Sequence, residues 1–140
     1  MFSKLLVVCT GNICRSPMGE YLLRERLADR PEMTVESAGV GALVGHPADA
    51  MALEVMRDHG MDADQHRARQ IDQAMVVSFD LILVMEQGQA RWIHQAFPMS
   101  RGRVHLITKW RGDAEVADPY RRPRSAFEQA WSDIAASVDD

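Results

Sequence analysis

Residues 5–17 read LLVVCTGNICRSP, and this stretch decides the fold class. The run over residues 5–8 is continuously apolar and half β-branched, which is typical of a strand buried on both faces of a parallel sheet. Pro17 suits the first turn of a helix, and apolar side chains follow at helical spacing at Met18, Tyr21, Leu22, Leu23 and Leu27. The stretch therefore predicts a central strand, a loop over residues 9–16 and a helix.

Strand and helix patterns alternate along the rest of the chain. Strands are predicted at residues 34–37, 80–85 and 104–107, and helices at residues 48–59, 72–77, 86–95 and 124–138. This alternation predicts an α/β fold, a three-layer sandwich in which a four-stranded parallel sheet is flanked by helices on both faces. Because such sheets bind ligands at the carboxyl ends of their strands, the loop after the first strand is the predicted ligand site.

Composition limits the class of protein. A chain of 140 residues with 46% hydrophobic and 26% charged residues fits a single globular domain over residues 1–140, and it excludes disordered, collagen-like and coiled-coil classes. A net charge of −4 argues against nucleic acid as a partner. The apolar run near the N-terminus is too short for a signal peptide or a membrane span, so we expect a cytoplasmic protein that is not membrane-embedded.

The numbers and spacing of cysteine and histidine residues indicate whether a metal site is expected. The two cysteines, Cys9 and Cys14, are too few for a disulfide scaffold or a four-thiolate zinc site, and the five histidines show no paired metal spacing. We therefore expect no metal and no cofactor. The three tryptophans, at positions 92, 110 and 131, are expected to be packing residues.

The loop itself carries the chemistry. A turn of this length that enters a helix can direct its backbone N–H groups, those of Thr10, Gly11, Asn12, Ile13 and Cys14, toward an anion, and the helix dipole adds positive potential there. The guanidinium of Arg15 can hold two phosphate oxygens at once. The same field favours the thiolate of Cys9, which would then face a bound phosphorus as a nucleophile. This is the pattern of a phosphate-binding loop after the first strand.

Other loop residues have supporting roles, and Ser16 is also expected to contribute to phosphate binding. Gly11 is expected to allow a backbone conformation that a Cβ would obstruct. The amide of Asn12 can brace the loop, and the Ser16 hydroxyl can donate a hydrogen bond to the Cys9 thiolate when it leaves a thiophosphate.

A thiolate nucleophile needs an acid to protonate the leaving group and a base to activate water. The chain has twenty carboxylates, so composition does not select one. Asp118 is favoured because Pro119 stiffens the chain directly after it and Tyr120 adds an aromatic surface. An Asp before a Pro is also a common turn, so the residues alone leave other carboxylates open.

Four motifs together resemble the low-molecular-weight protein tyrosine phosphatases: residues 8–17, 36–39 (ESAG), 66–70 (HRARQ) and 118–120 (DPY). The resemblance implies that Cys9 is the nucleophile, Arg15 binds phosphate and Asp118 acts first as acid and then as base. It also implies that Asn12, Ser16, Ser37 and His66 support the loop and that no metal is needed. By the same resemblance, Cys14 can form a reversible disulfide with Cys9 that shields the nucleophile from deeper oxidation.

Departures from the family pattern point to a branch. Many members have a second Tyr where Arg121 stands, and Arg121, Arg122 and Arg124 would add positive charge at the pocket mouth. Residues 39–45 would form the opposite wall, with Leu43 as its apolar contact. These features look like the bacterial branch that dephosphorylates tyrosine autokinases of capsule and exopolysaccharide export, which makes such a kinase the expected partner.

Ile13 bears on the substrate. Related phosphoarginine phosphatases usually have Thr at this position, so the apolar side chain favours a phenyl ring. Two other functions remain open. Thiol-linked arsenate reductases share the fold and loop, but they need further cysteines and none follows Cys14. A non-catalytic phosphate-binding module is the other alternative, although both nucleophile and acid are present here.

Overall fold

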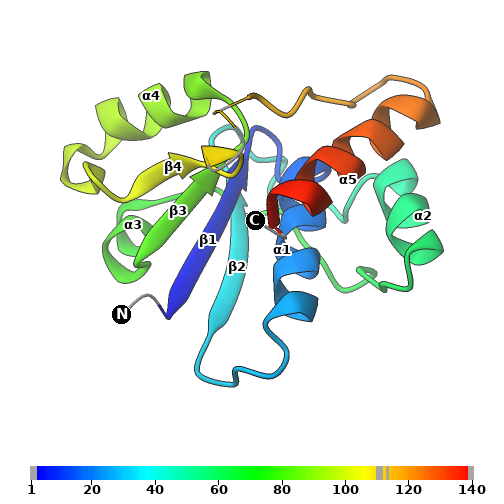
Figure 1. Ribbon diagram of the computed structural model, residues 1–140. Helices are drawn as coiled ribbons and strands as arrows, with labels where there is room; N and C mark the ends of the chain where they lie inside the picture. The colour runs from blue at the N-terminus through cyan, green and yellow to red at the C-terminus, as the bar shows by residue number, and fades with distance from the viewer. Residues whose placement is uncertain (1–2, 110–111, 113, 139–140) are drawn as a thin grey trace.

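The computed structural model describes residues 3–109, 112 and 114–138. Figure 1 shows the order of the elements: β1 (Lys4–Cys9), α1 (Arg15–Arg26), β2 (Thr34–Gly39), α2 (Ala50–Asp58), α3 (Gln73–Ser78), β3 (Leu81–Val84), α4 (Gln87–Ala96), the 3-10 helix η1 (Pro98–Ser100), β4 (Val104–Leu106) and α5 (Arg124–Val138). Every predicted strand and helix is present.

The four strands form one parallel sheet in the order β2-β1-β3-β4. The predicted four-stranded parallel sheet is therefore confirmed, and β1 is an interior strand with β2 and β3 on its two sides. β2 and β4 are the edges. The Cys9 end of β1 lies beside the Gly39 end of β2, so the loop after β1 begins at the carboxyl edge of the sheet.

Helices cover both faces of the sheet, which confirms the three-layer arrangement. In Figure 1, α1, α2 and α5 lie on one side of the sheet and α3 and α4 on the other. Alternate residues of β1 enter the two cores: Leu5 and Val7 pack with the α1 and α5 side, and Leu6 and Val8 pack with the α3 and α4 side. Burial on both faces is the reason that residues 5–8 are apolar without interruption.

Helix starts agree with the predicted capping residues. Pro17 lies in the first turn of α1, which begins two residues earlier, at Arg15. Asp72 precedes α3, and its carboxylate accepts a hydrogen bond from the N–H of Met75 at 2.9 Å. β2 runs two residues beyond the predicted end because Gly39 still pairs with Cys9 and also forms a bridge to Gln70.

The tryptophan expectation holds in part. Trp131 is buried and stacks on His59, with ring centroids 4.5 Å apart. Trp92 is 39% exposed and meets the ring of Phe97 edge-on, so it is not a core residue. Trp110 lies outside the described residues. Within those residues, every helix is too short or too polar to cross a membrane.

Candidate active site

The carbonyls of the loop after β1 all point away from its centre. The six carbonyl oxygens of residues 9–14 accept hydrogen bonds from groups outside the loop: the N–H groups of Val40, Gly41, Leu43, Asp49 and Met18 at 2.8–3.2 Å, and Nε2 of His66 at 2.7 Å. None of the described residues accepts a hydrogen bond from the N–H groups of residues 10–14. A peptide unit with its carbonyl turned outward directs its N–H inward, so the loop forms an anion-binding nest.

Arg15 lies under this nest with one edge anchored and one edge free. The side chain is 1% exposed; its Nη1 donates to the carboxylate of Glu86 and, at 2.8 Å, to the carbonyl of Val116. On the other edge, Nη2 is 3.6 Å from Oδ2 of Asp118, and the buried Nε–H has no hydrogen-bond partner within the described residues. A buried donor without an acceptor is costly, so this edge of the guanidinium is able to receive oxygens of an anion.

The thiol of Cys9 is linked to a chain of buried polar groups. Its Sγ is 2.9 Å from Oγ of Ser16. Nδ2 of Asn12 donates to that Oγ at 2.8 Å and to Oγ of Ser37 at 3.0 Å. Ser37 in turn donates to the carboxylate of Glu20. The side chains of Asn12, Ser16, Ser37 and Glu20 lie behind the loop, where they hold its shape without lining the pocket.

Asn12 and His66 fix the far side of the loop. Asn12 has a φ of 60°, a left-handed conformation that Asn tolerates better than most residues. Its Oδ1 accepts from the N–H of Arg69 at 2.8 Å. His66 is buried, bonded to the Asn12 carbonyl, and its Nδ1 is 3.9 Å from Glu20. The structure thus places both predicted support residues against the loop backbone.

A pocket of about 170 Å³ opens above Cys9. It is lined by Cys9, Thr10, Gly11, Ile13, Cys14, Arg15, Gly41, Leu43, Asp118 and Tyr120, so the structure brings together the predicted nucleophile, phosphate ligand, acid and apolar walls. Leu43 and Tyr120 are each 39% exposed and form the rim. Asp118 lies in the chain between β4 and α5, and its Oδ1 accepts from the N–H of Tyr120 at 3.0 Å.

The conformational role expected of Gly11 was wrong. Gly11 does not have a positive φ, and a Cβ there would meet Ile13 at an ordinary 3.6 Å. Gly39 at the end of β2 is the glycine that the loop needs, because a Cβ there would lie 2.4 Å from the carbonyl oxygen of Thr10. The left-handed residue is Asn12.

Cys14 is a buried free thiol beside the nucleophile. Burial, and secondarily the negative charges of Asp49, Cys9 and Asp118, raise the pKa of Cys14 far above that of an ordinary thiol. The side chain is therefore protonated at neutral pH, the form in which a thiol is a poor nucleophile.

Three residues of the site were missed by sequence reasoning. Glu86 anchors Arg15, Glu20 ends the buried chain from Cys9, and Nε2 of Gln89 donates to Oγ1 of Thr10 at 3.2 Å. The only available signal for Glu86 and Gln89 was their position just after β3, whose carboxyl end lies at the same sheet edge as the loop. For Glu20, the signal was its position on the face of α1 that is buried.

Comparison with known proteins places the chain in a family. Residues 4–140 match the family model described as low molecular weight phosphotyrosine protein phosphatase. The chain belongs to the low molecular weight protein tyrosine phosphatase family. It is 46% identical to the probable phosphatase EpsP of Ralstonia nicotianae (99% of this chain, 93% of that one), and 45% identical to the phosphatase Etp of Escherichia coli K12 (93% and 86%).

A solved relative has the same fold. The structure of Vibrio vulnificus Wzb in complex with benzylphosphonate superposes with a TM-score of 0.94 at 42% identity, covering 99% of this chain and 96% of that one. The resemblance seen in the sequence is confirmed, and this low molecular weight phosphatase is an enzyme that acts as a protein tyrosine phosphatase. The family assignment selects the phosphatase among the three functions that the sequence left open.

The basic cluster of this phosphatase divides into two parts. Arg121 has a φ of 63°, and its guanidinium lies over the ring of Tyr120 at 5.3 Å, beside the pocket rim. Arg124, the first residue of α5, is instead paired with Glu54 and Asp58 of α2 and with Glu128 of α5. Of these two arginines, Arg121 is the one that can add positive charge at the pocket mouth.

Proposed function

We propose that the enzyme hydrolyses protein phosphotyrosine through a cysteinyl-phosphate intermediate. The observation that carries the proposal is the free edge of Arg15: a buried guanidinium with an unpaired Nε–H, beneath inward-facing loop amides and next to the thiol of Cys9. This arrangement is a receptor for a tetrahedral dianion with a nucleophile at its base.

The first chemical step transfers the phosphoryl group to sulfur. The Cys9 thiolate attacks phosphorus, the bond from phosphorus to the phenolic oxygen breaks, and Asp118 gives its proton to the departing phenolate. Oxygen atoms of the transferred group stay on the free edge of Arg15 and on the loop amides as charge redistributes. Glu86 and the Val116 carbonyl keep Arg15 in place during this change.

The second step returns the enzyme to its starting state. Asp118, now a carboxylate, takes a proton from water while the water oxygen attacks phosphorus and the bond to sulfur breaks. The Ser16 hydroxyl, 2.9 Å from Sγ, stabilises the thiolate that leaves by donating a hydrogen bond to it. Inorganic phosphate is then released.

The substrate is proposed to be an aryl phosphate on a protein. Ile13, Leu43 and Tyr120 give the pocket apolar walls of the size of a phenyl ring. Benzylphosphonate, the ligand in the related Vibrio structure, joins a phenyl ring to a phosphonate. We propose that the natural partner is a bacterial tyrosine autokinase of exopolysaccharide or capsule production, acting with this enzyme in the cytoplasm.

An assay with aryl phosphates tests the roles of Cys9 and Asp118. With p-nitrophenyl phosphate, Cys9→Ser should lose all turnover, and Asp118→Ala should lower kcat by about 10²–10⁴-fold. The loss in Asp118→Ala should be larger for phenyl phosphate, whose leaving group needs the proton more. Asp29→Ala, at an exposed acid outside the pocket, is the matched control. Full activity of Cys9→Ser, or unchanged turnover of Asp118→Ala, would contradict the mechanism.

The partner is tested separately. Phosphate release should be seen from the phosphorylated tail of a bacterial tyrosine autokinase and from phosphotyrosine peptides, and far less from a phosphoarginine peptide. If no such tail is dephosphorylated, the partner is wrong although the chemistry stands.

A further inference from the structure

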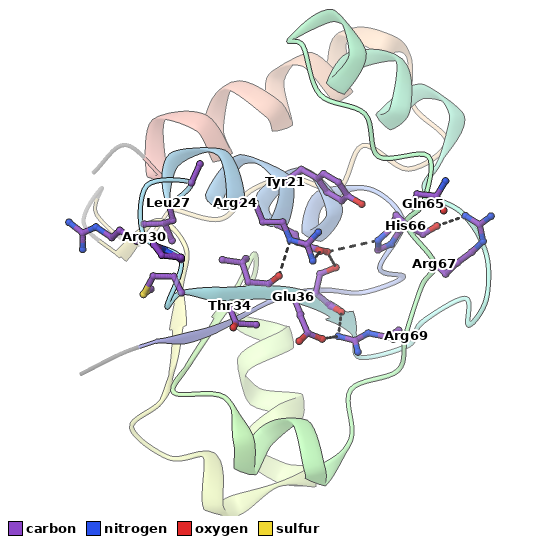
Figure 2. Close-up of a pocket in the computed structure, with 16 residues that line it drawn as sticks. Tyr21, Arg24, Leu27, Arg30, Thr34, Glu36, Gln65, His66, Arg67 and Arg69 are labelled. Atoms are coloured by element: carbon purple, nitrogen blue, oxygen red, sulfur yellow. Dashed lines mark hydrogen bonds and ion pairs between the residues drawn. The ribbon is translucent and has the colours of Figure 1, made fainter.

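A second concave region lies apart from the pocket of Cys9. It is a groove of about 620 Å³ between α1, the outer edge of β2 and residues 65–69, and it shares no lining residue with the pocket. We call it the α1–β2 groove. Figure 2 shows Arg24 extending from α1 across it toward β2, beside Tyr21, with Arg30 and Arg67 at opposite ends. Its volume lies in the range of small-molecule sites.

The floor of the groove is an unpaired strand edge. The N–H of Thr34 donates to the carbonyl of Ser3, just before β1. The backbone N–H and C=O groups of residues 34, 36 and 38 therefore point toward β1, and those of Val35 and Ser37 point outward. Both outward carbonyls are occupied: Val35 accepts from Nε of Arg24 at 3.0 Å, and Ser37 accepts from Nη2 of Arg69 at 3.3 Å. The outward N–H groups of Val35 and Ser37 have no acceptor among the described residues.

Among the described residues, this floor offers free hydrogen-bond donors, whereas each of its outward carbonyls already accepts a hydrogen bond. A peptide strand added to the edge would need both, because it donates as well as accepts along its length. An anionic group needs only donors. Val35 and Ser37 are both buried residues, so their unpaired N–H groups favour an acceptor that enters the groove.

Charge on the groove favours an anion as well. Arg24 pairs with Glu20, and Arg69 pairs with Glu36 at 2.7 Å. Within the described residues, Arg67 donates only to the backbone carbonyls of residues 64 and 66, so its charge is not neutralised by a carboxylate. The groove is therefore positive in a chain whose net charge is −4.

Apolar side chains also line the groove. The ring of Tyr21 lies 5.3 Å from the guanidinium of Arg24, and Leu27, Pro31 and Met33 continue the lining. We propose that the α1–β2 groove is an effector site for a small organic anion. A carboxylate or phosphate group of this effector accepts from Arg24 and the free N–H groups of β2, and its apolar body lies against Tyr21 and Leu27.

The groove is joined to the active site by hydrogen bonds. Arg24 holds Glu20, Glu20 accepts from Ser37, and the chain continues through Asn12 and Ser16 to the sulfur of Cys9. An anion that draws Arg24 away leaves the buried carboxylate of Glu20 without its cation. The added negative potential disfavours the thiolate of Cys9, so occupancy slows the enzyme. This link, unlike the binding itself, rests on the proposed role of Cys9.

Binding is tested with 1-naphthoate as the probe. The anion is titrated into ¹⁵N-labelled enzyme whose phosphate loop is saturated with inorganic phosphate. We expect saturable NMR shifts at Nε of Arg24 and at the amides of Val35 and Ser37. Neutral 1-naphthamide should cause none in the same unmodified protein. Shifts confined to residues 10–15, or equal shifts with the amide, would overturn the site.

Two variants sharpen the binding test. Arg24→Gln should abolish the shifts, and Arg91→Gln should leave them intact because Arg91 is an exposed residue of α4, on the opposite face of the sheet. Equal binding by both variants would overturn the assignment of Arg24. The measurement needs no catalysis, so it stands even if the proposed phosphatase mechanism fails.

The link to Cys9 is tested by its alkylation with iodoacetamide at a fixed pH, without phosphate. Saturating 1-naphthoate should slow alkylation about fivefold or more in the unmodified enzyme and should have no effect in Arg24→Gln. Slowing that persists in Arg24→Gln would mean that the probe covers Cys9 directly, and unchanged rates in both proteins would mean that the groove is not coupled. Either result overturns the link.

Discussion

At the scale of single residues, the buried guanidinium of Arg15 is held in a fixed orientation by its neighbours. Its Nη1 edge is held by Glu86 and the Val116 carbonyl, while its Nε lacks a partner among the described residues. Such a side chain is oriented before any anion arrives, so little conformational entropy is lost on binding. The cost of the unpaired donor is recovered when an oxygen accepts from it.

Replacing Glu86 by Gln should weaken this orientation. The charged partner of Arg15 is lost while the size of the side chain is kept, and one charge-assisted hydrogen bond is worth about 1.5–3 kcal/mol. We expect kcat/KM for an aryl phosphate to fall about tenfold or more. Glu115→Gln is the control, because Glu115 binds the N–H of Gln87 near the same helix start and does not contact Arg15. Equal effects of the two variants would contradict the role of Glu86.

At the scale of elements, the loop depends on how closely the end of β2 approaches it. Gly39 pairs with Cys9 and lies against the carbonyl of Thr10, whereas Gly41 has open space around its Cα. The fold therefore requires a glycine at the strand end, outside the loop whose shape it permits.

Gly39→Ala should both destabilise the enzyme and lower its activity. The new Cβ would lie 2.4 Å from the Thr10 oxygen, and relief of such a clash typically costs about 1–3 kcal/mol. The free energy of unfolding in urea and kcat/KM should fall together. Gly41→Ala, where a Cβ meets nothing within 4 Å, should leave stability nearly unchanged. A stable, active Gly39→Ala variant would be inconsistent with the close approach.

Asp80 ties the start of β3 to the start of β1. Its Oδ2 accepts from the N–H groups of Ser3 and Lys4 at 2.9 and 3.0 Å, and these hydrogen bonds lower the pKa of Asp80 in the folded state. A lowered folded-state pKa adds stability above the unfolded pKa, which is near 4, and this stability is lost as the pH falls through the folded value.

The variant Asp80→Asn should therefore be less stable than the parent at pH 7, and the difference should shrink as the pH falls below about 4. The measurement is urea unfolding of both proteins between pH 7 and pH 3. A difference that stays constant over this range would contradict the assigned pKa shift.

At the scale of the whole molecule, the two cores share the interior strand β1. Leu5 and Val7 enter one core and Leu6 and Val8 enter the other, so neither core can open without disturbing β1. We expect residues 1–140 to unfold as a single domain in one transition. Far-ultraviolet circular dichroism and tryptophan fluorescence should give the same urea midpoint. Separate midpoints would contradict the single-domain prediction.

Local patterns were sufficient to predict most of the fold. The apolar run at residues 5–8 predicted the interior strand, and Asp72 and Pro17 predicted helix starts, because these signals act within a few residues. The loop motif also predicted the members of the pocket from Cys9 to Arg15.

Contacts between distant residues were beyond the reach of those patterns. Arg15 and Glu86 are 71 positions apart, and the carboxylate that receives Arg15 could not be distinguished among twenty without the sheet order. The need for glycine at position 39 was missed for the same reason, since a Cβ there is excluded by the carbonyl of Thr10, in the loop after β1. The α1–β2 groove is likewise a product of packing between elements.

Because the carbonyls of residues 9–14 point outward, the inward N–H groups of the loop are also open to the phosphate product. Amides and a guanidinium edge that receive three equatorial oxygens hold free phosphate as well as a phosphate ester, because both present the same tetrahedral face. If the loop holds phosphate as proposed, we expect inorganic phosphate to be a product inhibitor that competes with substrate. The rate at a given level of phosphoprotein should then fall as the concentration of phosphate rises.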